Sequence, residues 1–321
     1  MRKKTLITGC SGFLGNHLFL KMQCLSFPVM SLGRTKPKNV SSSDHIYSNL
    51  SANSEFIDAL KDTSTIIHCA ARVHVMNNTL SDSLEVYREV NVAGTLNLAK
   101  QAINAGVRRF IFISSIKVNG ESTPVNKPFR FDDERSPEDP YGQSKSEAEE
   151  QLLQLAKETG LEVVIIRPTL VYGPGVKANF SALMNLVSKG VPLPFGCITD
   201  NKRSLVSVDN LVDLIITCID HPKAINEVFL VSDGYDVSTS EMVRKMAVVL
   251  NKPQIQIPIP KYCYRLAGKV FGKEDVVHRL LDSLQVDISH TKKTLDWTPP
   301  QSIDDGFRNA ANAFMENKLK G

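Results

Sequence analysis

The sequence lacks most of the features that mark membrane-spanning, metal-binding or nucleic-acid-binding proteins. No apolar run approaches the roughly 18 residues that a membrane span requires. The 38 basic and 34 acidic residues are spread along the chain, without a basic cluster that would attract nucleic acid. The six cysteines show no C-x-x-C or other metal-ligand spacing. We therefore expect no bound metal, no membrane contact and no nucleic-acid partner.

Size and cysteine usage narrow the class further. The basic start, Met1–Lys4, is followed by an apolar run too short for a secretory leader, so scattered cysteines predict reduced thiols in a cytoplasmic protein. The 321 residues suit one large α/β domain with a smaller lobe rather than a single core. The net charge of +4 would suit a small anionic substrate.

Short apolar runs alternate with helix-length amphipathic segments in the first half. This alternation is typical of a parallel sheet with crossover helices. The expected strands are Thr5–Thr8, Val29–Leu32, Thr65–Cys69, Arg109–Ser114 and Glu162–Arg167. The expected helices are Phe13–Cys24, Leu84–Ala105 and Tyr141–Thr159.

The pattern changes after Arg167-Pro168. Glycine and proline interrupt the chain at Tyr172–Gly175 and Pro192–Gly196, and the segment from Ser238 to about Leu284 is again helical in character. We therefore predict a sheet domain over residues 1–170 and a smaller lobe over 171–321. Some segments of the second half, such as Val228–Val231, are expected to return to the main sheet.

Three glycines follow the first expected strand. Gly9, Gly12 and Gly15 meet the needs of a tight turn, a close backbone approach to phosphate and close packing of helix on strand. The helix that begins near Phe13 would direct its N-terminal N–H groups at the anion. The turn therefore predicts a dinucleotide site, with further contacts from Ser11, Phe13 and Leu14.

A serine, a tyrosine and a lysine supply the expected chemistry. Free tyrosine titrates near pH ~10, and Lys145, one helical turn after Tyr141, would lower that value together with a positive nicotinamide ring. Ser115, at the end of the expected strand Arg109–Ser114, would hydrogen-bond the substrate oxygen. This arrangement predicts hydride transfer at a carbonyl, with Tyr141 passing the proton and Lys145 also holding the nicotinamide ribose.

With Ser115 and the Y-x-x-x-K pair, the G-x-x-G-x-x-G turn resembles the extended short-chain dehydrogenases/reductases, the NAD-dependent epimerase/dehydratase family. His68–Ala71, Asn91–Thr95 and Tyr172–Gly175 match further motifs of that family. The resemblance implies an α/β, Rossmann-type doubly wound parallel sheet with a C-terminal substrate-binding lobe. It also implies cofactor contacts at Cys69, Ala70, Ala71, Asn91, Tyr141, Lys145 and Pro168.

The end of the second expected strand bears on the choice of coenzyme. An acidic residue there would favour NAD(H), but the sequence has Gly33 followed by Arg34, with Lys36 close by. Cations in place of a carboxylate favour NADP(H) over NAD(H), unless Arg34 merely stacks on adenine. The aspartate that the family places near the adenine is replaced in Asn49-Leu50, where Asn49 can still hydrogen-bond.

The substrate contacts follow from the same resemblance. Arg203 and Arg279 would meet a diphosphate, although each could also be a solvated surface charge. Dehydratases of the family carry an acidic pair after the strand-five hydroxyl residue, where this chain has Ile116 and Lys117. A 4,6-dehydratase is therefore not expected. The remaining expected substrate contacts are Ser115, Lys117, Asn179, Pro194 and Phe195.

The segments Ser114–Glu121, Asn179–Phe180 and Pro192–Gly196 are similar to those of enzymes that act at C4 of UDP-linked amino sugars in surface-polysaccharide synthesis. The main prediction is an NAD(P)-dependent reductase of a UDP-4-keto-6-deoxy-N-acetylhexosamine, such as forms UDP-N-acetylquinovosamine. The alternative is a UDP-glucose or UDP-N-acetylglucosamine 4-epimerase. Two other hypotheses remain: a reductase of an apolar ketone, which Arg203 disfavours, and a non-catalytic dinucleotide-binding protein, which would usually lack Tyr141 or Lys145. The resemblance also implies a homodimer through Leu84–Ala105 and Tyr141–Thr159.

Overall fold

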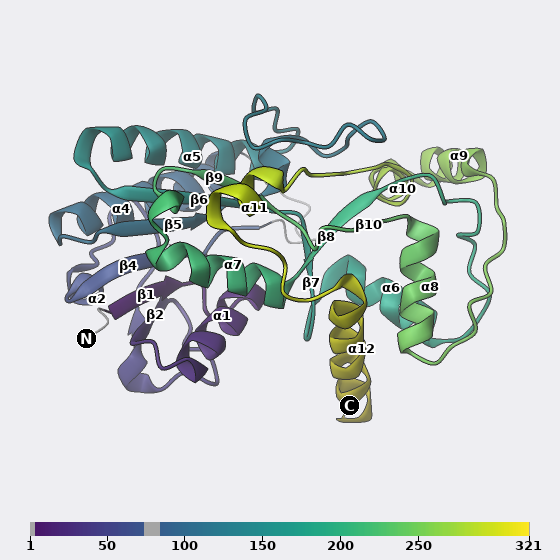
Figure 1. Cartoon of the computed structure of the whole chain (residues 1–321), viewed down its shortest axis with the longest axis horizontal. Coiled ribbons are helices and arrows are strands. Elements are labelled where there is room, and N and C mark those ends of the chain that lie inside the picture. Colours follow the sequence, from purple (N-terminus) through teal and green to yellow (C-terminus); the bar gives the residue numbers. More distant parts are fainter. Residues whose placement is uncertain (1–3, 74–83, 321) are drawn as a thin grey trace.

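Two β-sheets organise the computed structural model, which describes residues 4–73 and 84–320 (Figure 1). The larger sheet has seven strands in the order β3-β2-β1-β4-β5-β6-β9, and every neighbouring pair is parallel. Its order reverses between β1 and β4, which confirms the predicted Rossmann-type doubly wound sheet. The strands are β1 (Lys4–Thr8), β2 (Val29–Gly33), β3 (His45–Tyr47), β4 (Thr63–His68), β5 (Arg109–Ile113), β6 (Glu162–Pro168) and β9 (Val228–Val231).

Helices cover both faces of this sheet. On one face lie α1 (Phe13–Cys24) and α7 (Val208–Asp220), which pack against each other. On the other lie α4 (Thr95–Asn104) and α5 (Pro140–Thr159). The short elements of this part are α2 (Ile57–Leu60), α3 (Leu84–Tyr87), a π-helical stretch (Arg88–Gly94) and α11 (Ser289–Leu295).

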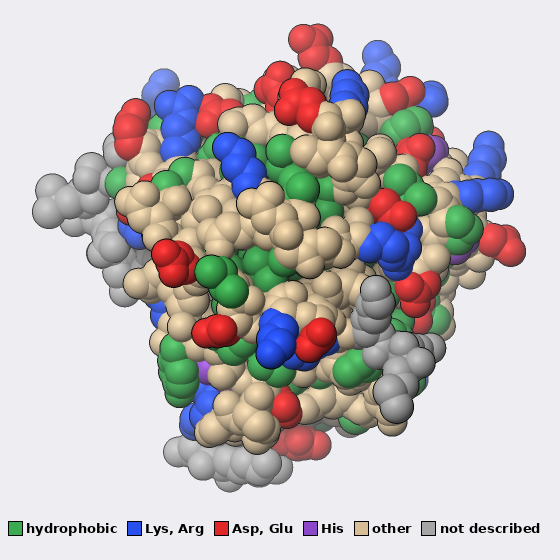
Figure 2. All heavy atoms as spheres, turned by 90° about the vertical axis from the view of Figure 1, so that its left-hand side faces the viewer, with side chains coloured by type: hydrophobic (Ala, Val, Ile, Leu, Met, Phe, Trp, Pro, Cys, Tyr) green, Lys and Arg blue, Asp and Glu red, His purple; other side chains and the backbone are tan. Residues whose placement is uncertain are grey.

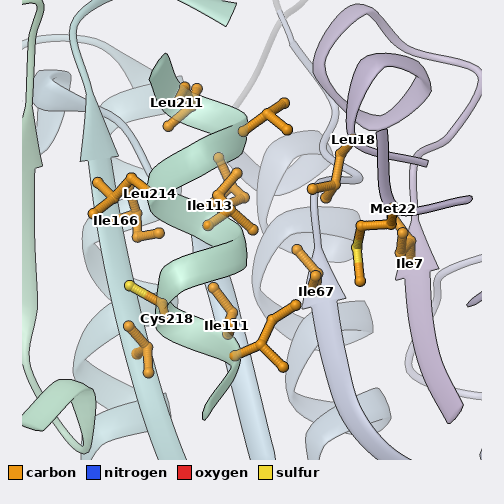
Figure 3. Packing of buried hydrophobic residues seen from close by; sticks show 14 of the residues in the cluster. Ile7, Leu18, Met22, Ile67, Ile111, Ile113, Ile166, Leu211, Leu214 and Cys218 are labelled. Atoms are coloured by element: carbon orange, nitrogen blue, oxygen red, sulfur yellow. The ribbon is translucent and has the colours of Figure 1, made fainter. Parts of the chain in front are cut away.

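Strand residues point alternately to the two faces, which explains why the strands read as continuous apolar runs. Ile111 and Ile113 of β5 join the core under α1 and α7, whereas Phe110 and Phe112 join the core under α4 and α5. Figure 3 shows the first of these cores, where strand isoleucines meet Leu18 of α1 and the side chains of α7. The labelled residues are Ile7, Leu18, Met22, Ile67, Ile111, Ile113, Ile166, Leu211, Leu214 and Cys218.

A second, three-stranded sheet in the order β10-β8-β7 supports the smaller part of the molecule. Its core includes Tyr172, Phe180 and Phe307, whose rings lie 5.1 to 5.5 Å apart. The strands are β7 (Leu170–Tyr172), β8 (Arg203–Ser207) and β10 (Asp236–Val237). The helices are α6 (Ala178–Ser188), α8 (Thr239–Val249), α9 (Lys261–Phe271), α10 (Glu274–Leu281) and α12 (Ile303–Lys320).

The second half of the chain also returns to the first sheet. Strand β9 pairs with β6, as expected for Val228–Val231, and α7 covers the sheet beneath it. Trp297 is 5% exposed within the same core, and its indole nitrogen donates to Asp213 of α7 at 2.8 Å. The end of the sequence therefore completes the core that the beginning starts.

The structure differs from the sequence predictions in three places. The single helix expected over Leu84–Ala105 is divided by the π-helical stretch, whose Gly94 lies so close to the backbone of Leu50 that a Cβ would be 2.9 Å away. The helical tail is interrupted between α8 and α9 by a segment that contains three prolines. The three-residue strand β3 was not predicted, because its polar residues give no apolar run.

Surface and cysteine features complete the description. The six cysteines are free thiols. In residues 4–73 and 84–320, no helix is long and apolar enough to cross a membrane, and no group of three or more His, Cys, Asp or Glu could hold a metal ion. On the face drawn in Figure 2, side chains of both charge signs are intermingled.

Candidate active site

The glycine loop between β1 and α1 leaves no room for side chains. Gly9 has a φ of +77°, and a Cβ on it would lie 2.7 Å from the backbone nitrogen of Ala70. A Cβ on Gly15 would collide with the Gly9 carbonyl oxygen. Both positions therefore need glycine, and the backbone remains open to a ligand at this edge of the sheet.

The start of α1 has the properties of an anion site. Gly12 is the N-cap and provides no side-chain cap, and the first turn holds no acidic residue. The first N–H groups of the helix are thus directed at the loop without a capping carboxylate, which fits the diphosphate of a nicotinamide dinucleotide. Ser11 is exposed at this loop, and Phe13 and Leu14 are half-buried.

A buried hydrogen-bond chain joins this loop to the end of β4. Thr8 Oγ1 accepts from the backbone N–H of Ala70 at 3.1 Å and lies 3.0 Å from His68 Nδ1, while His68 Nε2 lies 3.0 Å from Thr95 Oγ1. Burial, and then the charge of Lys145, lower the pKa of His68 to about 3, so the ring is neutral. The sequence indicates only a family motif at this place. In the structure, these hydrogen bonds hold in position the segment after β4 that contains Cys69, Ala70 and Ala71.

Asn91 acts within the protein. Its side-chain oxygen accepts from the N–H of Arg72 at 2.7 Å, and its nitrogen donates to the Arg72 carbonyl and to Ser144 Oγ. The residue is 1% exposed. Asn91 thus bridges the segment after β4 and helix α5, and the cofactor contact expected at this residue stays a prediction.

The end of β2 has the residues that the sequence indicated. Gly33 is the last residue of the strand, and a Cβ on it would meet nothing within 4 Å. Arg34 is exposed, and the Lys36 ammonium donates to a backbone carbonyl. Asn49 is exposed after β3, and Leu50 is half-buried beside it.

Helix α5 presents Tyr141 and Lys145 in successive turns. Asp139 is its N-cap and accepts from the Gly142 N–H at 2.6 Å. Lys145 is 1% exposed and donates from Nζ to the Ile113 carbonyl at the end of β5, at 2.7 Å. Burial lowers the pKa of Lys145 to about 8.

The protein without coenzyme does not lower the pKa of Tyr141. Burial, then the charge of Asp139, then Tyr87, raise the pKa of Tyr141 above its usual value. Lys145 is not among these influences, and its ammonium is directed at the Ile113 carbonyl. Without a nicotinamide ring, burial dominates the pKa of Tyr141, and the lowering expected from Lys145 together with that ring stays a prediction.

Lys117 links two carboxylates beside the same turn. Its ammonium lies 2.6 Å from Glu121 and 2.6 Å from Asp139. Burial lowers the pKa of Lys117, but the hydrogen bonds to Asp139 and Glu121 outweigh it, so the net shift is upward. Ser115, which accepts from the Lys117 backbone N–H at 3.2 Å, lies at the start of this turn. No local sequence pattern indicates Asp139 as part of the site.

A buried ion pair holds α5 to the sheet. Arg167 at the end of β6 donates to both oxygens of Glu149, with a shortest distance of 2.6 Å, and to Asn119 Oδ1 at 2.9 Å. Glu149 lies one turn after Lys145 and is fully buried. Pro168, the next residue of β6, is buried as well. This network fixes the helix that carries the proposed catalytic pair.

Two arginines of the smaller part interact electrostatically. Arg203, the first residue of β8, donates to the Asp282 carbonyl at 3.1 Å. Burial lowers the pKa of Arg203, Asp282 opposes this, and the charge of Arg279 on α10 lowers it further. Two cations held within electrostatic reach of each other suit a shared anion such as a diphosphate.

The other expected substrate residues differ in how far their side chains are exposed. Asn179 is exposed in the first turn of α6. Pro194 is half-buried, whereas Phe195 is 7% exposed and belongs to the core of the smaller part. Phe195 therefore packs in that core, and its expected contact with the substrate stays a prediction.

The fold and site together define a Rossmann-type oxidoreductase of the short-chain dehydrogenase/reductase class. The model of the NAD dependent epimerase/dehydratase family matches residues 5–232, and the chain belongs to that family. It is an NAD-dependent nucleotide-sugar oxidoreductase or epimerase.

Individual relatives agree with this assignment. The chain is 59% identical over 317 residues to a UDP-glucose 4-epimerase from Vibrio cholerae, covering 98% of this chain and 97% of the relative. The structure of a UDP-glucose 4-epimerase from Thermotoga maritima with UDP-glucose is similar, with a TM-score of 0.78 at 22% identity over 98% and 99% of the two chains. A UDP-glucuronic acid 4-epimerase from Bacillus cereus in complex with NAD has a TM-score of 0.79 at 20% identity, covering 98% and 99%.

Proposed function

We propose that the chain is a 4-epimerase of a UDP-hexose, UDP-glucose or its N-acetylated counterpart. The observation that carries this proposal is the 59% identity to the Vibrio cholerae UDP-glucose 4-epimerase over almost the full length of both chains. This identity supports the epimerase, the alternative of the sequence analysis, better than the reductase.

The residues at the carboxyl edge of the sheet are suited to this reaction. A bound nicotinamide coenzyme supplies a hydride acceptor and donor. Tyr141 takes the proton of the C4 hydroxyl as the sugar is oxidised, and returns it to the C4 oxygen after the 4-keto sugar has presented its other face. Ser115 hydrogen-bonds the same oxygen, and Lys145 holds the coenzyme ribose near the start of α5.

The second half of the chain chiefly provides the substrate side, in our proposal. Arg203 and Arg279 bind the diphosphate of the UDP-sugar, supported by their mutual electrostatic coupling and the anion preference of guanidinium groups. Asn179, Lys117 and Pro194 contact the nucleotide-sugar, and Phe195 orders the loop beside it. The division near residue 170 then separates coenzyme binding from most of the substrate binding.

A product assay tests the proposal. Purified protein is incubated with UDP-glucose or UDP-N-acetylglucosamine, with and without added NAD⁺, and the C4 epimers are quantified by NMR. We expect interconversion that Tyr141→Phe lowers by several orders of magnitude while coenzyme binding persists. Full turnover by Tyr141→Phe would show that another group carries the proton.

One observation favours a second candidate, the reductase of a UDP-4-keto-6-deoxy-N-acetylhexosamine. The end of β2 has Gly33 and Arg34 in place of a carboxylate, which suits the 2′-phosphate of NADP(H), a coenzyme that a reductase exchanges at each turnover. Consumption of NADPH at 340 nm with the 4-keto substrate, in the absence of epimerisation, would establish this candidate. Binding titrations with NAD⁺ and with NADP⁺ under the same conditions determine the coenzyme preference independently of turnover.

We also propose a cytoplasmic homodimer built on α4 and α5 that acts in surface-polysaccharide synthesis. A groove of about 780 Å³ runs between these helices and the π-helical stretch, lined by side chains that include Leu96 and Gln151. Light scattering after size exclusion should give twice the mass of the 35.5 kDa chain. Leu96→Arg should give the monomer, and an unchanged mass would place any interface elsewhere.

A further inference from the structure

The most exposed large apolar side chains of the described residues gather on one helix. On α9, Tyr262, Leu266, Val270 and Phe271 are 70%, 63%, 69% and 75% exposed. They are four of the six most exposed large apolar side chains in residues 4–73 and 84–320. Exposed apolar residues occur singly on most surfaces, so such a concentration on an eleven-residue helix indicates an interaction surface.

Three of these side chains form one stripe. Tyr262, Leu266 and Val270 are spaced by four residues, so they lie on the same side of the helix. The opposite side packs on α10, where a Cβ on Gly268 would lie 2.7 Å from the side chain of Val277. The amphipathic helix thus turns its apolar side away from the protein, whereas a helix of a globular protein normally buries that side.

Cations adjoin the stripe. Arg265 and Lys269 are exposed one position before Leu266 and Val270, and neither has an ion-pair partner within residues 4–73 and 84–320. Helix α9 contains no acidic residue, and its remaining cation, Lys261, pairs with Asp200. The outward surface of α9 is therefore apolar with a basic flank, and Glu274 and Asp282 line the groove that this flank shares with α10.

We propose that the outward face of α9 docks the protein on an anionic phospholipid surface. Aliphatic and aromatic side chains beside cations are what an interfacial helix needs, because the former enter the acyl boundary and the latter meet lipid phosphates. In Figure 1, α9 lies at the outer end of the smaller part, remote from the seven-stranded sheet, so a flat surface can reach it.

The charge pattern distinguishes this occupant from a second copy of the chain. An antiparallel two-fold contact through the same stripe would bring Arg265 and Lys269 of each copy towards those of the other, and like charges oppose such a contact. Anionic lipid complements them instead. The sequence predicted no membrane contact because it has no run of spanning length, but a helix that lies on a bilayer needs no such run.

Vesicle sedimentation with the full chain tests the proposal. We expect the wild-type protein to sediment with phosphatidylcholine vesicles that contain phosphatidylglycerol, and far less with phosphatidylcholine alone. The double variant Leu266→Ser/Val270→Ser should lower the partition coefficient by about tenfold or more, because it removes the apolar contact. Raising the salt concentration should weaken binding of the wild type through screening of the cations.

Matched controls separate docking from general stickiness. Val248→Ser/Ile225→Ser removes two exposed apolar side chains outside α9, which are 55% and 39% exposed, and should leave vesicle binding unchanged. As a direct reporter, the emission that Tyr262→Trp adds to that of Trp297 should shift to the blue on adding the anionic vesicles. Absence of wild-type binding at low salt, equal binding by the α9 variant, or an α9 variant that merely changes the mass in solution would each overturn the proposal. These readouts do not depend on enzymatic activity.

Discussion

At the start of α5, Asp139 both caps the helix and affects the pKa of Tyr141. Asp139 caps the helix through the Gly142 N–H, which stabilises the helix on which Tyr141 and Lys145 lie. Its charge also raises the pKa of Tyr141, after the larger effect of burial. Lys117, 2.6 Å from Asp139, opposes that charge. The protonation of the proposed catalytic tyrosine therefore depends on a carboxylate outside the familiar motif.

Asp139→Asn should move the pH dependence of the reaction. The amide keeps an oxygen for the helix cap but removes the negative charge, so the pKa of Tyr141 falls. Oxidation of the sugar hydroxyl needs deprotonated Tyr141, and its rate rises with pH through that pKa. The rising limb of the kcat profile should therefore shift to lower pH, which pH-dependent initial rates would measure.

Glu121→Gln is the matched control for this shift. Glu121 shares the Lys117 ammonium at the same distance of 2.6 Å, but it is not among the groups that raise the pKa of Tyr141. In the Glu121→Gln variant, the rising limb of kcat against pH should lie at the same pH as in the wild type. Two results would contradict this electrostatic account: a rising limb that shifts by the same amount in both variants, or a rising limb that shifts to higher pH in Asp139→Asn.

At the scale of single elements, the glycine loop connects local backbone geometry to coenzyme binding. Gly15→Ala should abolish coenzyme binding, since the new methyl group would collide with the Gly9 carbonyl and displace the loop. Calorimetric titration with NAD⁺ would measure the loss. Asn16→Ala, one position along α1, introduces no such collision and should bind the coenzyme normally. Retained binding by Gly15→Ala would show that the loop can relax around a side chain.

Arg109 fastens the end of α7 to the main sheet. Its side chain is fully buried and donates to Glu162 and to the carbonyls of Cys218, Ile219 and His221, at 2.6 to 3.0 Å. Arg109→Met would leave these acceptors without their donor, so we expect the free energy of unfolding to fall by about 3–5 kcal/mol. Urea denaturation followed by circular dichroism would measure the change.

The neighbouring arginine supplies the control. Arg108 also pairs with Glu162, at 3.1 Å, but its side chain is 44% exposed. Arg108→Met should cost about 1 kcal/mol or less, since exposed ion pairs contribute little. Equal losses in the two variants would mean that burial of Arg109 adds nothing.

The elements themselves show what the sequence could predict. Helix α1 has the predicted bounds, and the five predicted strands occur within one or two residues, because long apolar runs and glycine stops are local signals. The π-helical stretch was not predictable, since it depends on the approach of Gly94 to the distant Leu50. Strand β3 is three residues long, too short for a periodic pattern.

Some contacts of the candidate site could likewise be predicted from the sequence, and others could not. The common edge for Ser115 and α5 could be predicted, because parallel strands end at one edge, and the structure brings Lys145 to the last residue of β5. The bridge from Lys117 to Asp139 joins residues 22 positions apart through an irregular segment, and no local pattern specifies such a contact. The pairing of Arg167 with Glu149 depends likewise on tertiary packing.

For the whole molecule, the chain connectivity links the two sheets. The three-stranded sheet begins directly after β6, and the chain then returns through α7, β9 and α11 to the first sheet. Trp297 lies in the core that also contains Ile7 of β1. The two parts therefore share structure instead of joining through a single linker.

Unfolding should accordingly occur in one step. Trp297 is the sole tryptophan, so its fluorescence reports the shared core, while circular dichroism reports all helices. We expect the two signals to give the same midpoint in urea. Helical signal that persists after the tryptophan has become exposed would show that the smaller part remains folded by itself.

The late return of the chain also affects synthesis on the ribosome. While only residues 1–170 have emerged, α7, β9 and the segment around Trp297 are still missing, and the face of the nascent sheet that includes Ile67 and Ile111 is uncovered. Such a surface attracts other nascent chains and chaperones. Most of the polypeptide must therefore be made before the half that we propose binds the coenzyme can finish folding, although its glycine loop is translated first.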